Sequence, residues 1–427
     1  MTALTARPGN ALVGKAAIPG DKSCSHRALI FAAMAEGESN IAGLNEADDV
    51  MRTVAAITAL GVEAERIGEG QWRVCGARWS SPDAPIDCGN SGTTARLLIG
   101  AVAGMEGVSA AFTGDASLSA RPMRRVVVPL QRMGAKVEGG ETLLITVHGA
   151  ALGGIEFSNV PASAQVKSAI LLAGLSGAAP VRIVEPMPSR DHSEIMLGQF
   201  GCPVGIVEGK IELGAARSPV GCDLTIGADP SAAAFALTAA AIVAGSSVTV
   251  EGMLVNPLRT GLVEALEEMG AAVELANERI VSGEILADVT IGHGRLQGIT
   301  LAAHRIPAMI DEIPALAVAA ALADGETVIE GLGELRVKES DRLGAIVAGL
   351  VACGVTALAD GDSLRIFGRK KARGGNVLSQ GDHRIAMAFL TLGLAAEGPV
   401  TLDDGAMIAT SFPDFVPSMR ALGADIA

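Results

Sequence analysis

Residues 19–34 read Pro-Gly-Asp-Lys-Ser-Cys-Ser-His-Arg-Ala-Leu-Ile-Phe-Ala-Ala-Met, so a stretch rich in cations and hydroxyls runs directly into seven apolar residues. Pro-Gly ends a preceding strand, and the apolar run predicts a buried helix that begins near Lys22. The first turn of a helix offers unpaired N–H groups and the positive end of its dipole. Arg27 follows Ser23 by four residues and shares its face. The stretch predicts an anion-binding helix start, although a capped core helix with solvated charges would read alike.

The same pattern occurs six times along the chain. Each repeat contains, in order, a polar start, an alanine-rich helix, a glycine turn, a short strand, a second helix and a closing glycine. The starts of successive repeats are 66 to 82 residues apart. Several of these helices, such as residues 232–242, are apolar on all sides and must be surrounded. Three repeats packed around their buried helices form one domain, so the chain predicts two. The six starts are Asp21, Asn90, Ser163, Asp229, Asp311 and Asp382.

The domain boundary is expected between the third and fourth repeats. This boundary gives a first domain of residues 20–228 and a second domain of residues 229–427. Residues 1–19 precede the first repeat and can supply a strand to either domain. Strands alternating with helices indicate an α/β protein. Equivalent helix starts from the two halves are expected to face one cleft, which must close to act.

Composition excludes several classes of protein. The chain has 427 residues, 49% hydrophobic residues, a mean hydropathy of +0.40 and a net charge of −14, with two Trp, nine Phe and no Tyr. An acidic chain with few aromatic residues is a poor partner for nucleic acid. No apolar run reaches the roughly 20 residues of a membrane span, and no signal peptide opens the chain, so a cytoplasmic enzyme is expected.

The cysteines and histidines predict neither disulfides nor a metal site. The six cysteines form no CxxC pair, and the six histidines form no ligand pattern such as HExxH. Cys24 lies inside the opening stretch and could act as a nucleophile, but His26 two residues on would face elsewhere on a helix.

Cations and hydroxyls recur at the other helix starts, matched by only a few carboxylates. A cleft lined in this way would hold a ligand with several negative charges, leaving Lys22, Asp311 and Glu339 to move protons. Each group taken alone could equally be a cap or a solvated charge. The further candidates are Gly92, Arg96, Arg121, Ser163, Gln165, Lys167, Arg190, Glu312, Lys338, Arg342 and Arg384.

Five stretches, in order along nearly the whole chain, resemble the EPSP synthase (3-phosphoshikimate 1-carboxyvinyltransferase) family of enolpyruvyl transferases. They are residues 19–29, 89–96 (Gly-Asn-Ser-Gly-Thr-Thr-Ala-Arg), 119–123 (Ser-Ala-Arg-Pro-Met), 336–342 (Arg-Val-Lys-Glu-Ser-Asp-Arg) and 381–387 (Gly-Asp-His-Arg-Ile-Ala-Met). Ser-Arg-Asp-His at 189–192 and Pro-Ala-Met-Ile-Asp-Glu at 307–312 are similar to the glyphosate-tolerant bacterial subgroup.

The resemblance implies a two-domain inside-out α/β barrel, each domain built of three βαβαββ repeats around buried parallel helices, with residues 1–19 joining the second domain. It implies a cofactor-free monomer that transfers the enolpyruvyl group of phosphoenolpyruvate to the 5-hydroxyl of shikimate 3-phosphate through a tetrahedral intermediate. Phosphate would be released, in the route to aromatic amino acids.

Residue roles follow from the same resemblance. Lys22 would contact phosphoenolpyruvate near Gly92 and join in proton transfer, Asp311 would take the 5-hydroxyl proton, and Glu339 would exchange a proton with the methylene carbon. Arg121, Arg342 and Arg384 would hold phosphoenolpyruvate. Shikimate 3-phosphate would be held by Ser23, Arg27, Ser163, the backbone of Ala164, Gln165 and Arg190, with Lys338 nearby.

Two departures from the family pattern have consequences. Many members carry a lysine where this chain has Thr410, so one phosphate contact is expected to be missing or replaced. Gly92 stands where tolerant enzymes can have alanine, so Gly92→Ala is expected to lower sensitivity to glyphosate by narrowing the phosphoenolpyruvate pocket.

Two other functions remain to be weighed. UDP-N-acetylglucosamine enolpyruvyltransferase shares the fold and the donor, but its family has a reactive loop cysteine that is absent around residues 116–119. A catalytically silent anion-binding protein on the same scaffold would not need Lys22, Asp311, Glu339 and Arg384 together.

Overall fold

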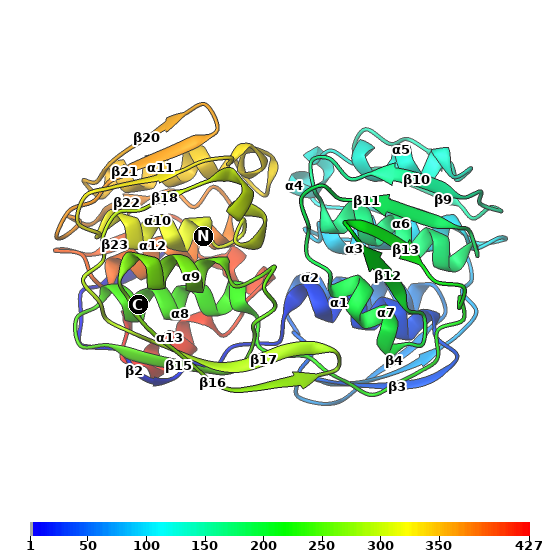
Figure 1. Cartoon of the computed structure of the whole chain (residues 1–427), viewed down its shortest axis with the longest axis horizontal. Helices are drawn as coiled ribbons and strands as arrows, with labels where there is room; N and C mark the ends of the chain where they lie inside the picture. The colour runs from blue at the N-terminus through cyan, green and yellow to red at the C-terminus, as the bar shows by residue number, and fades with distance from the viewer. Residues whose placement is uncertain (1–2) are drawn as a thin grey trace. The chain divides into compact units, whose positions relative to one another are not determined.

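The computed structural model describes residues 3–427 and divides the chain into two compact units (Figure 1). Unit 1 comprises the residues up to Pro19 together with Gly227–Ile280 and Ile285–Ala427, and unit 2 comprises Gly20–Ile226 and Val281–Glu284. The sequence predicted a division near residues 227–229, but it carried no sign that the short segment 281–284 belongs with unit 2.

Unit 2 contains three four-stranded sheets of one design. In each sheet a parallel pair of strands is followed by two strands in antiparallel pairing. The strands are β14 (Leu224–Thr225), β3 (Gly37–Ala42), β5 (Gln71–Gly76) and β4 (Glu63–Gly68); β6 (Ile86–Asp87), β7 (Ser109–Thr113), β9 (Ile145–His148) and β8 (Lys136–Glu138); and β10 (Ile155–Ser158), β11 (Val181–Val184), β13 (Lys210–Leu213) and β12 (Val204–Val207), in spatial order.

Unit 1 repeats this design, and each of its sheets also contains a parallel pair. Both N-terminal strands, β1 and β2, pair inside this unit. The strands are β2 (Val13–Lys15), β15 (Ser247–Leu254), β17 (Glu284–Gly292) and β16 (Ala272–Val281); β18 (Thr300–Leu301), β19 (Glu326–Ile329), β21 (Ser363–Phe367) and β20 (Thr356–Asp360); and β22 (Gly375–Val377), β23 (Val400–Leu402), β1 (Leu4–Arg7) and β24 (Asp425–Ile426).

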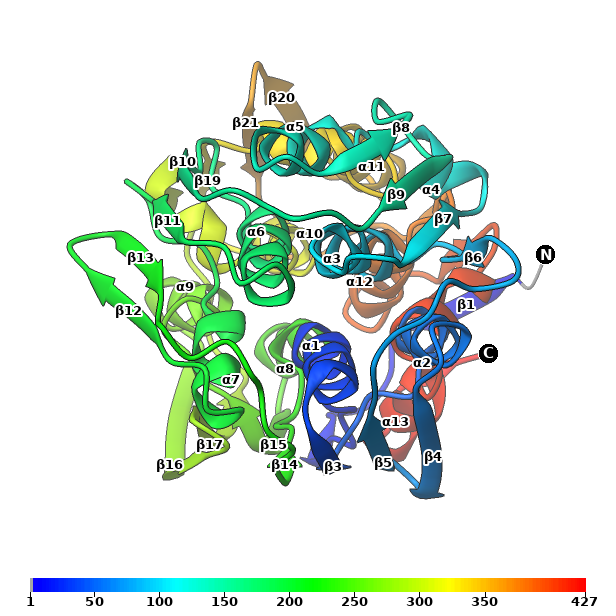
Figure 2. The same ribbon diagram turned by 90° about the vertical axis from the view of Figure 1, so that its right-hand side faces the viewer.

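Each unit encloses three helices that are buried along nearly their whole length. In unit 2, α3 lies against both α1 and α6 (Figure 2), and in unit 1, α8, α10 and α12 contact one another. The six central helices are α1 (Lys22–Met34), α3 (Gly92–Ala103), α6 (Ala164–Ser176), α8 (Pro230–Ile242), α10 (Ile313–Ala321) and α12 (His383–Gly393). They are the alanine-rich helices of the six sequence repeats.

The remaining helices are shorter on average and less buried. They are α2 (Asp48–Ala59), α4 (Ala116–Ala120), α5 (Arg124–Arg132) and α7 (His192–Gln199) in unit 2, and α9 (Gly261–Met269), α11 (Arg342–Ala352), α13 (Phe415–Ala421) and the 3-10 helices η1 (Ala303–Ala308), η2 (Gly333–Val337) and η3 (Ala406–Thr410) in unit 1. Across residues 3–427, the helices fall short of the length and apolar character that crossing a bilayer requires.

Small residues allow the central helices to approach closely. A Cβ atom on Gly100 in α3 would lie only 2.3 Å from the carbonyl oxygen of Ala169 in α6. Because the obstacle is backbone, no side-chain rotation could make room. Gly100 therefore sets the distance between the two helices.

Polar side chains cap five of the six central helices at their N-termini. Asp21, Ser91, Ser163, Asp229 and Asp382 each accept a hydrogen bond from a backbone N–H of the first turn. Such caps satisfy donors that the helix cannot pair internally. Helix capping is thus sufficient to explain why a polar residue occurs at these five helix starts.

Candidate active site

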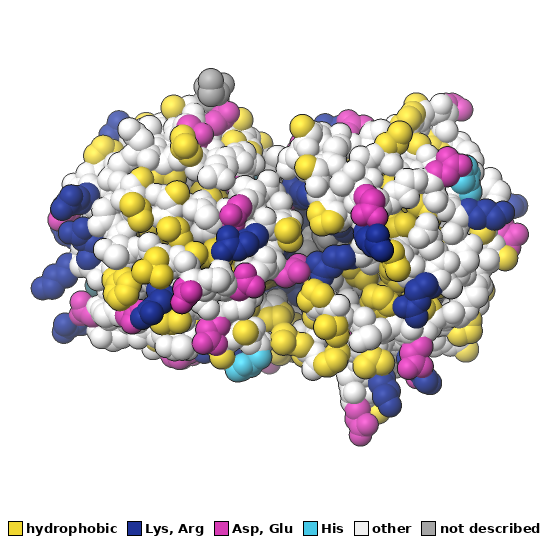
Figure 3. Space-filling model, turned by 90° about the horizontal axis from the view of Figure 1, so that it is seen from above, with side chains coloured by type: hydrophobic (Ala, Val, Ile, Leu, Met, Phe, Trp, Pro, Cys, Tyr) yellow, Lys and Arg dark blue, Asp and Glu magenta, His cyan; other side chains and the backbone are white. Residues whose placement is uncertain are grey.

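The residues predicted to act on substrate fall into two groups, one in each unit. The unit 2 cluster comprises Lys22, Ser23, Arg27, Gly92, Arg121, Ser163, Ala164, Gln165 and Arg190, and the unit 1 cluster comprises Asp311, Lys338, Glu339, Arg342 and Arg384. On the face drawn in Figure 3, acidic and basic side chains are mixed over the exposed surface. Several cations of the two clusters, by contrast, are buried.

Lys22 is the first residue of α1, as predicted, and its ammonium has a carboxylate partner. Lys22 Nζ lies 2.7 Å from Asp49 Oδ2, and the two side chains are 15% and 11% exposed. Asp49 belongs to the first turn of α2, where acidic residues are common because they complement the helix dipole. Because that role is ordinary, nothing in the local pattern singled out Asp49.

Arg27 is almost fully buried and joins three helices. Its guanidinium donates hydrogen bonds to the side-chain oxygens of Ser193 in α7 and Ser168 in α6, each at 2.7 Å, and to the carbonyl oxygen of Ser23 at 2.9 Å. Burial lowers the pKa of Arg27, and the positive charge of Arg190 acts in the same direction. Arg190 is therefore close enough to act on Arg27 and its neighbour Ser23, although it lies more than 160 residues further along the chain.

Gln165 connects the starts of α6 and α3. It accepts a hydrogen bond from Arg96 Nη1 at 2.9 Å and donates one to Thr93 Oγ1 at 2.9 Å. A Cβ atom on Gly92 would lie 2.6 Å from Arg96 Nη1 and 3.3 Å from Arg121 Nη1. Gly92, Arg121 and Gln165 therefore surround Arg96, which the sequence offered as a candidate without a role.

Ser163 and Ala164 form the first turn of α6. The Ser163 hydroxyl accepts the N–H of Val166 at 3.5 Å, and the Ala164 carbonyl accepts the Ser168 hydroxyl at 2.6 Å. Because Ser168 also binds Arg27, this helix start and Arg27 are held in one hydrogen-bonded group.

Arg342 is the centre of the unit 1 cluster. It is 1% exposed, donates from Nε to Asp382 Oδ2 at 2.7 Å and from Nη1 to Asp311 Oδ1 at 3.3 Å, and also binds Glu339. Burial alone would lower the pKa of Arg342, but the carboxylates of Asp382, Glu339 and Asp311 raise it above its ordinary value. The two carboxylates predicted to move protons thus share one guanidinium.

Two further cations complete this cluster. Lys338 Nζ lies 3.4 Å from Asp311 Oδ1, and Arg384 Nη1 donates to the Asp311 carbonyl oxygen at 3.1 Å. Asp382 is completely buried and caps α12 while it binds Arg342. The sequence identified Asp382 as a cap but not as the partner of Arg342.

The pair Asp311-Glu312 could have been caps of α10 or a catalytic base. Glu312 occupies the N-cap position, but its side chain makes no capping hydrogen bond and instead accepts the hydroxyl of Ser231. Asp311 binds Lys338 and Arg342. Glu312 therefore does not cap α10, and the Asp311 carboxylate is engaged by two cations of the unit 1 cluster.

Thr410, which stands where many family members have lysine, lies at the end of η3. Its hydroxyl donates to the Met407 carbonyl oxygen at 2.7 Å and lies 3.4 Å from His383 Nδ1. A neutral hydroxyl beside the residue that precedes Arg384 does not supply the missing positive charge.

Cys24 is buried and belongs to a group of three potential metal ligands. Donor atoms of Asp21, Cys24 and His192 lie within 4.8 Å of one another. Asp21 already caps Cys24 N–H at 2.7 Å, and His192 Nδ1 lies 2.7 Å from Glu284 Oε1. These bonds engage one oxygen of Asp21 and one ring nitrogen of His192, and a buried thiol such as that of Cys24 is a poor nucleophile.

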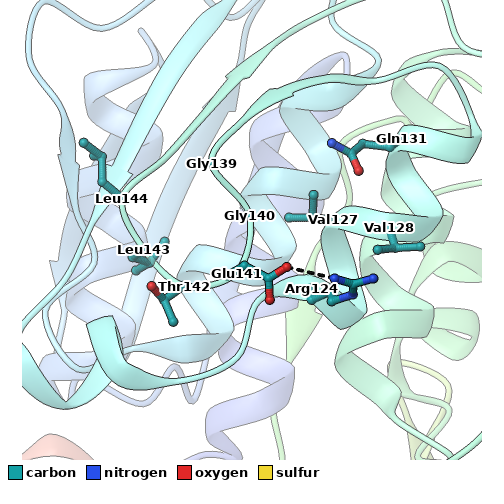
Figure 4. A pocket seen from close by; sticks show the side chains of 10 residues that line it. All are labelled: Arg124, Val127, Val128, Gln131, Gly139, Gly140, Glu141, Thr142, Leu143 and Leu144. Carbon is teal, nitrogen blue, oxygen red and sulfur yellow. Dashed lines mark hydrogen bonds and ion pairs between the residues drawn. The ribbon is translucent and has the colours of Figure 1, made fainter.

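A pocket of about 440 Å³ lies in unit 2, between α5 and the segment that joins β8 to β9 (Figure 4). Arg124 and Glu141 point toward one another across it, with 2.9 Å between their charged atoms. Its lining is otherwise mostly apolar and glycine, and includes no residue of the unit 2 cluster.

Comparison with known proteins identifies relatives over the full chain. The family model for EPSP synthase (3-phosphoshikimate 1-carboxyvinyltransferase) matches residues 6–419. The 3-phosphoshikimate 1-carboxyvinyltransferase of Phenylobacterium zucineum is 50% identical, covering 99% of this chain and 95% of the relative. That of Methylorubrum extorquens is also 50% identical, covering 99% and 97%.

Solved structures agree with these sequence matches. EPSP synthase from Acinetobacter baumannii superposes with a TM-score of 0.88 at 39% identity, covering 100% of both chains. The enolpyruvyl transferase NikO from Streptomyces tendae gives 0.82 at 20% identity, covering 100% of this chain and 98% of that one, which bears on the fold alone. The predicted two-domain α/β fold class is confirmed.

Proposed function

This chain belongs to the EPSP synthase family, and from that premise we propose how its residues divide the work of the reaction. The enzyme transfers the enolpyruvyl group of phosphoenolpyruvate to the 5-hydroxyl of shikimate 3-phosphate by addition and elimination, releasing phosphate, in aromatic amino-acid biosynthesis. Neither transfer to a nucleotide sugar nor a silent anion-binding role is favoured by relatives that carry this name along the whole chain.

Shikimate 3-phosphate is held by the hydroxyl, amide and guanidinium groups of unit 2. The support is chemical: the first turn of α6 presents backbone N–H groups, Arg27 binds Ser168 in the same helix, and the positive charge of Arg190 acts on Arg27. Two neighbouring guanidinium groups repel each other, so a phosphate or carboxylate placed between them relieves that repulsion. The residues assigned to this substrate are Ser23, Arg27, Ser163, Ala164, Gln165 and Arg190, with Lys338 nearby.

Phosphoenolpyruvate is held by Lys22, Arg121, Arg342 and Arg384, with Gly92 leaving room for it. Each of these cations has a carboxylate, carbonyl or amide oxygen as its partner in the described structure. An arriving anion can exchange with such oxygens without leaving a buried cation unpaired.

Asp311 takes the proton of the 5-hydroxyl, and Glu339 exchanges a proton with the methylene carbon. The single observation that carries this assignment is that Arg342 binds both carboxylates, since a cation that holds phosphoenolpyruvate then also places both proton carriers beside it. When the anion takes over the guanidinium, carboxylate oxygens are released to accept protons.

The test is phosphate release from phosphoenolpyruvate with shikimate 3-phosphate or UDP-N-acetylglucosamine as acceptor. We expect release only with shikimate 3-phosphate, and a loss of release in both Arg342→Lys and Asp311→Asn. Normal turnover in these two variants would remove the proposed roles while leaving the family assignment untouched.

Four coarser features are proposed with this function. The functional domains are residues 20–228 and residues 1–19 with 229–427, which follows the compactness of the two units. One chain contains both clusters, which supports a monomer. The relatives are bacterial biosynthetic enzymes, which supports the cytoplasm. The motifs at 189–192 and 307–312 support membership of the glyphosate-tolerant subgroup. Sedimentation tests the monomer, and the glyphosate inhibition constant tests the subgroup.

A further inference from the structure

A buried ion pair lies behind the start of α6. The side chain of Glu185, which follows β11, is 3% exposed, and its Oε2 lies 2.9 Å from Lys167 Nζ in α6. The same oxygen accepts the Ser189 N–H at 3.1 Å. Its Oε1 accepts the Ser189 hydroxyl at 2.7 Å and a hydrogen bond from Asn159 Nδ2. Each carboxylate oxygen of Glu185 thus accepts two hydrogen bonds, which is the usual capacity of the group.

These contacts join two segments of the unit 2 cluster. Asn159 Nδ2 also donates to the carbonyl oxygen of Ser163, at 3.1 Å. Ser189, bound twice by Glu185, immediately precedes Arg190, and its carbonyl oxygen accepts from Lys167 Nζ at 3.3 Å. One carboxylate therefore ties the chain before α6 to the chain before α7.

Lys167 has a second carboxylate partner, Glu194, for which the structure shows no bond to Asn159 or Ser189 such as Glu185 makes. Glu194 Oε1 lies 2.7 Å from Lys167 Nζ, and the Glu194 side chain is 2% exposed. Burial raises the pKa of Glu194, whereas Lys167 and the Ser189 hydrogen bonds outweigh burial and lower the pKa of Glu185. The partners of Glu185 thus favour its charged form, and charged acceptors make the stronger hydrogen bonds.

We propose that Glu185 is a positioning residue that fixes the separation of Ser163 and Arg190 and thereby sets the affinity for shikimate 3-phosphate. The inference rests on the proposed function, in which Ser163 and Arg190 hold that substrate. Glu185 touches neither the substrate nor the reacting atoms, so its effect is on binding and not on the chemical step.

Glu185→Gln tests the proposal because no orientation of the amide can replace the carboxylate. With its NH2 group at the Oε2 position, the amide faces Lys167 Nζ and the Ser189 N–H, both obligatory donors. With NH2 at the Oε1 position, it faces Asn159 Nδ2, which must turn away and release the Ser163 carbonyl.

Calorimetry of shikimate 3-phosphate binding without phosphoenolpyruvate gives the first readout, and steady-state kinetics gives the second. We expect Glu185→Gln to raise the Kd and KM for shikimate 3-phosphate by about tenfold or more, as for a lost hydrogen bond to a charged group. The KM for phosphoenolpyruvate and kcat at saturating shikimate 3-phosphate should stay within about twofold.

Glu194→Gln is the matched control, because it makes the same change at a carboxylate equally buried and bound to the same lysine. It should leave the Kd for shikimate 3-phosphate within about twofold. Equal weakening in both variants would indicate general loosening around Lys167 and would overturn the proposal.

Two more variants keep the test decisive. If Glu185→Gln does not fold, Ser189→Ala removes one of its contacts and should raise the same KM severalfold; an unchanged KM then overturns the proposal. Ser163→Ala and Arg190→Ala test the proposed function itself. Weakening by these two without weakening by Glu185→Gln overturns only the inference, whereas no effect from any of them overturns both.

Discussion

Arg342 shows how one residue can bring together the carboxylates that we propose to be catalytic. Its guanidinium binds Asp311, Glu339 and Asp382 at once, and Asp382 in turn is fixed by capping α12. The unit 1 cluster together with Asp382 then has three cations and three carboxylates, with Lys338, Arg342 and Arg384 balancing Asp311, Glu339 and Asp382. An anionic substrate can enter such a balanced group by replacing oxygen atoms that are already present.

Glu339→Gln should lose turnover and keep affinity. Glutamine retains an oxygen that Arg342 can bind, but it cannot carry a proton, so kcat should fall about 10²- to 10⁴-fold while KM values change only severalfold. Steady-state kinetics measures both. The exposed Glu330→Gln is the control and should behave as wild type, and a large loss of binding with normal turnover would contradict the proton-transfer role.

Gly92→Ala should weaken the contacts around phosphoenolpyruvate. The new methyl group would press on the Arg96 guanidinium at 2.6 Å and on that of Arg121 at 3.3 Å. We expect the KM for phosphoenolpyruvate and the inhibition constant of glyphosate both to rise, with the latter rising more. The KM for shikimate 3-phosphate serves as an internal control. Equal glyphosate inhibition constants for wild type and variant would refute the prediction.

His26 should make the protein sensitive to mild acid. Burial, reinforced by Lys22 and Arg27, holds the pKa of His26 well below its ordinary value of 6.5. Below about pH 6.5 the unfolded chain therefore binds a proton that the folded chain does not, so stability present above pH 6.5 is lost as the pH falls. The loss approaches about 1.4 kcal/mol per pH unit for one group.

Urea unfolding at pH 7.5 and pH 5.5 measures this effect. His26→Gln should lose about 1 kcal/mol less between the two pH values than wild type does. His293→Gln, at an exposed position, should follow wild type. Parallel losses in wild type and His26→Gln would show that His26 is not the titrating group.

At the scale of elements, each central helix serves the core and the site with different parts. The apolar body of α6 is buried in unit 2, while its first turn presents Ser163, Ala164 and Gln165. The packing of the apolar residues of α6 in unit 2 fixes the position of the first turn of this helix. A substitution in the body can therefore move groups that lie one or two turns away.

Gly100→Ala should show this coupling between α3 and α6. Its Cβ would lie 2.3 Å from the Ala169 carbonyl oxygen, so the helices must separate. We expect a loss of about 1–3 kcal/mol in the free energy of unfolding, measured in urea, with a higher KM for shikimate 3-phosphate. Gly198→Ala in α7, where a Cβ meets open space, should instead gain up to about 1 kcal/mol. A loss in both variants would contradict the close-approach argument.

At the scale of the whole molecule, two units with separate cores divide one chain. Each unit has three sheets around three buried helices, so we expect each unit to unfold as a cooperative structure of its own. The net charge of −14 is spread over the chain, while the cations of the two clusters lie at helix starts and inside hydrogen-bonded groups.

Core substitutions should therefore loosen one unit at a time. Leu171→Ala in α6 and Leu316→Ala in α10 each remove a fully buried side chain and should cost about 2–5 kcal/mol. Native-state hydrogen exchange should show faster exchange in unit 2 for Leu171→Ala and in unit 1 for Leu316→Ala. A uniform increase across both units in either variant would show that the chain unfolds as one.

The sequence by itself determined the repeat, the buried helices and the residue types at their starts. Helix signals depend on neighbours within a few residues, so Asp21, Ser163 and Asp382 could be recognised as caps from local pattern alone. Family resemblance then assigned roles to Lys22, Asp311 and Glu339. None of this required knowing which distant segments meet.

Only the tertiary structure decided which groups are partners. Asp49 beside Lys22, Asp382 beside Arg342 and Glu185 beside Asn159 and Lys167 are pairs separated by 18 to 40 residues. Local pattern does not reveal the cation that each carboxylate binds, because a buried ion pair is selected by the packing that removes water from both members. The sequence therefore determined where the charges are, and the fold decided which of them are buried together.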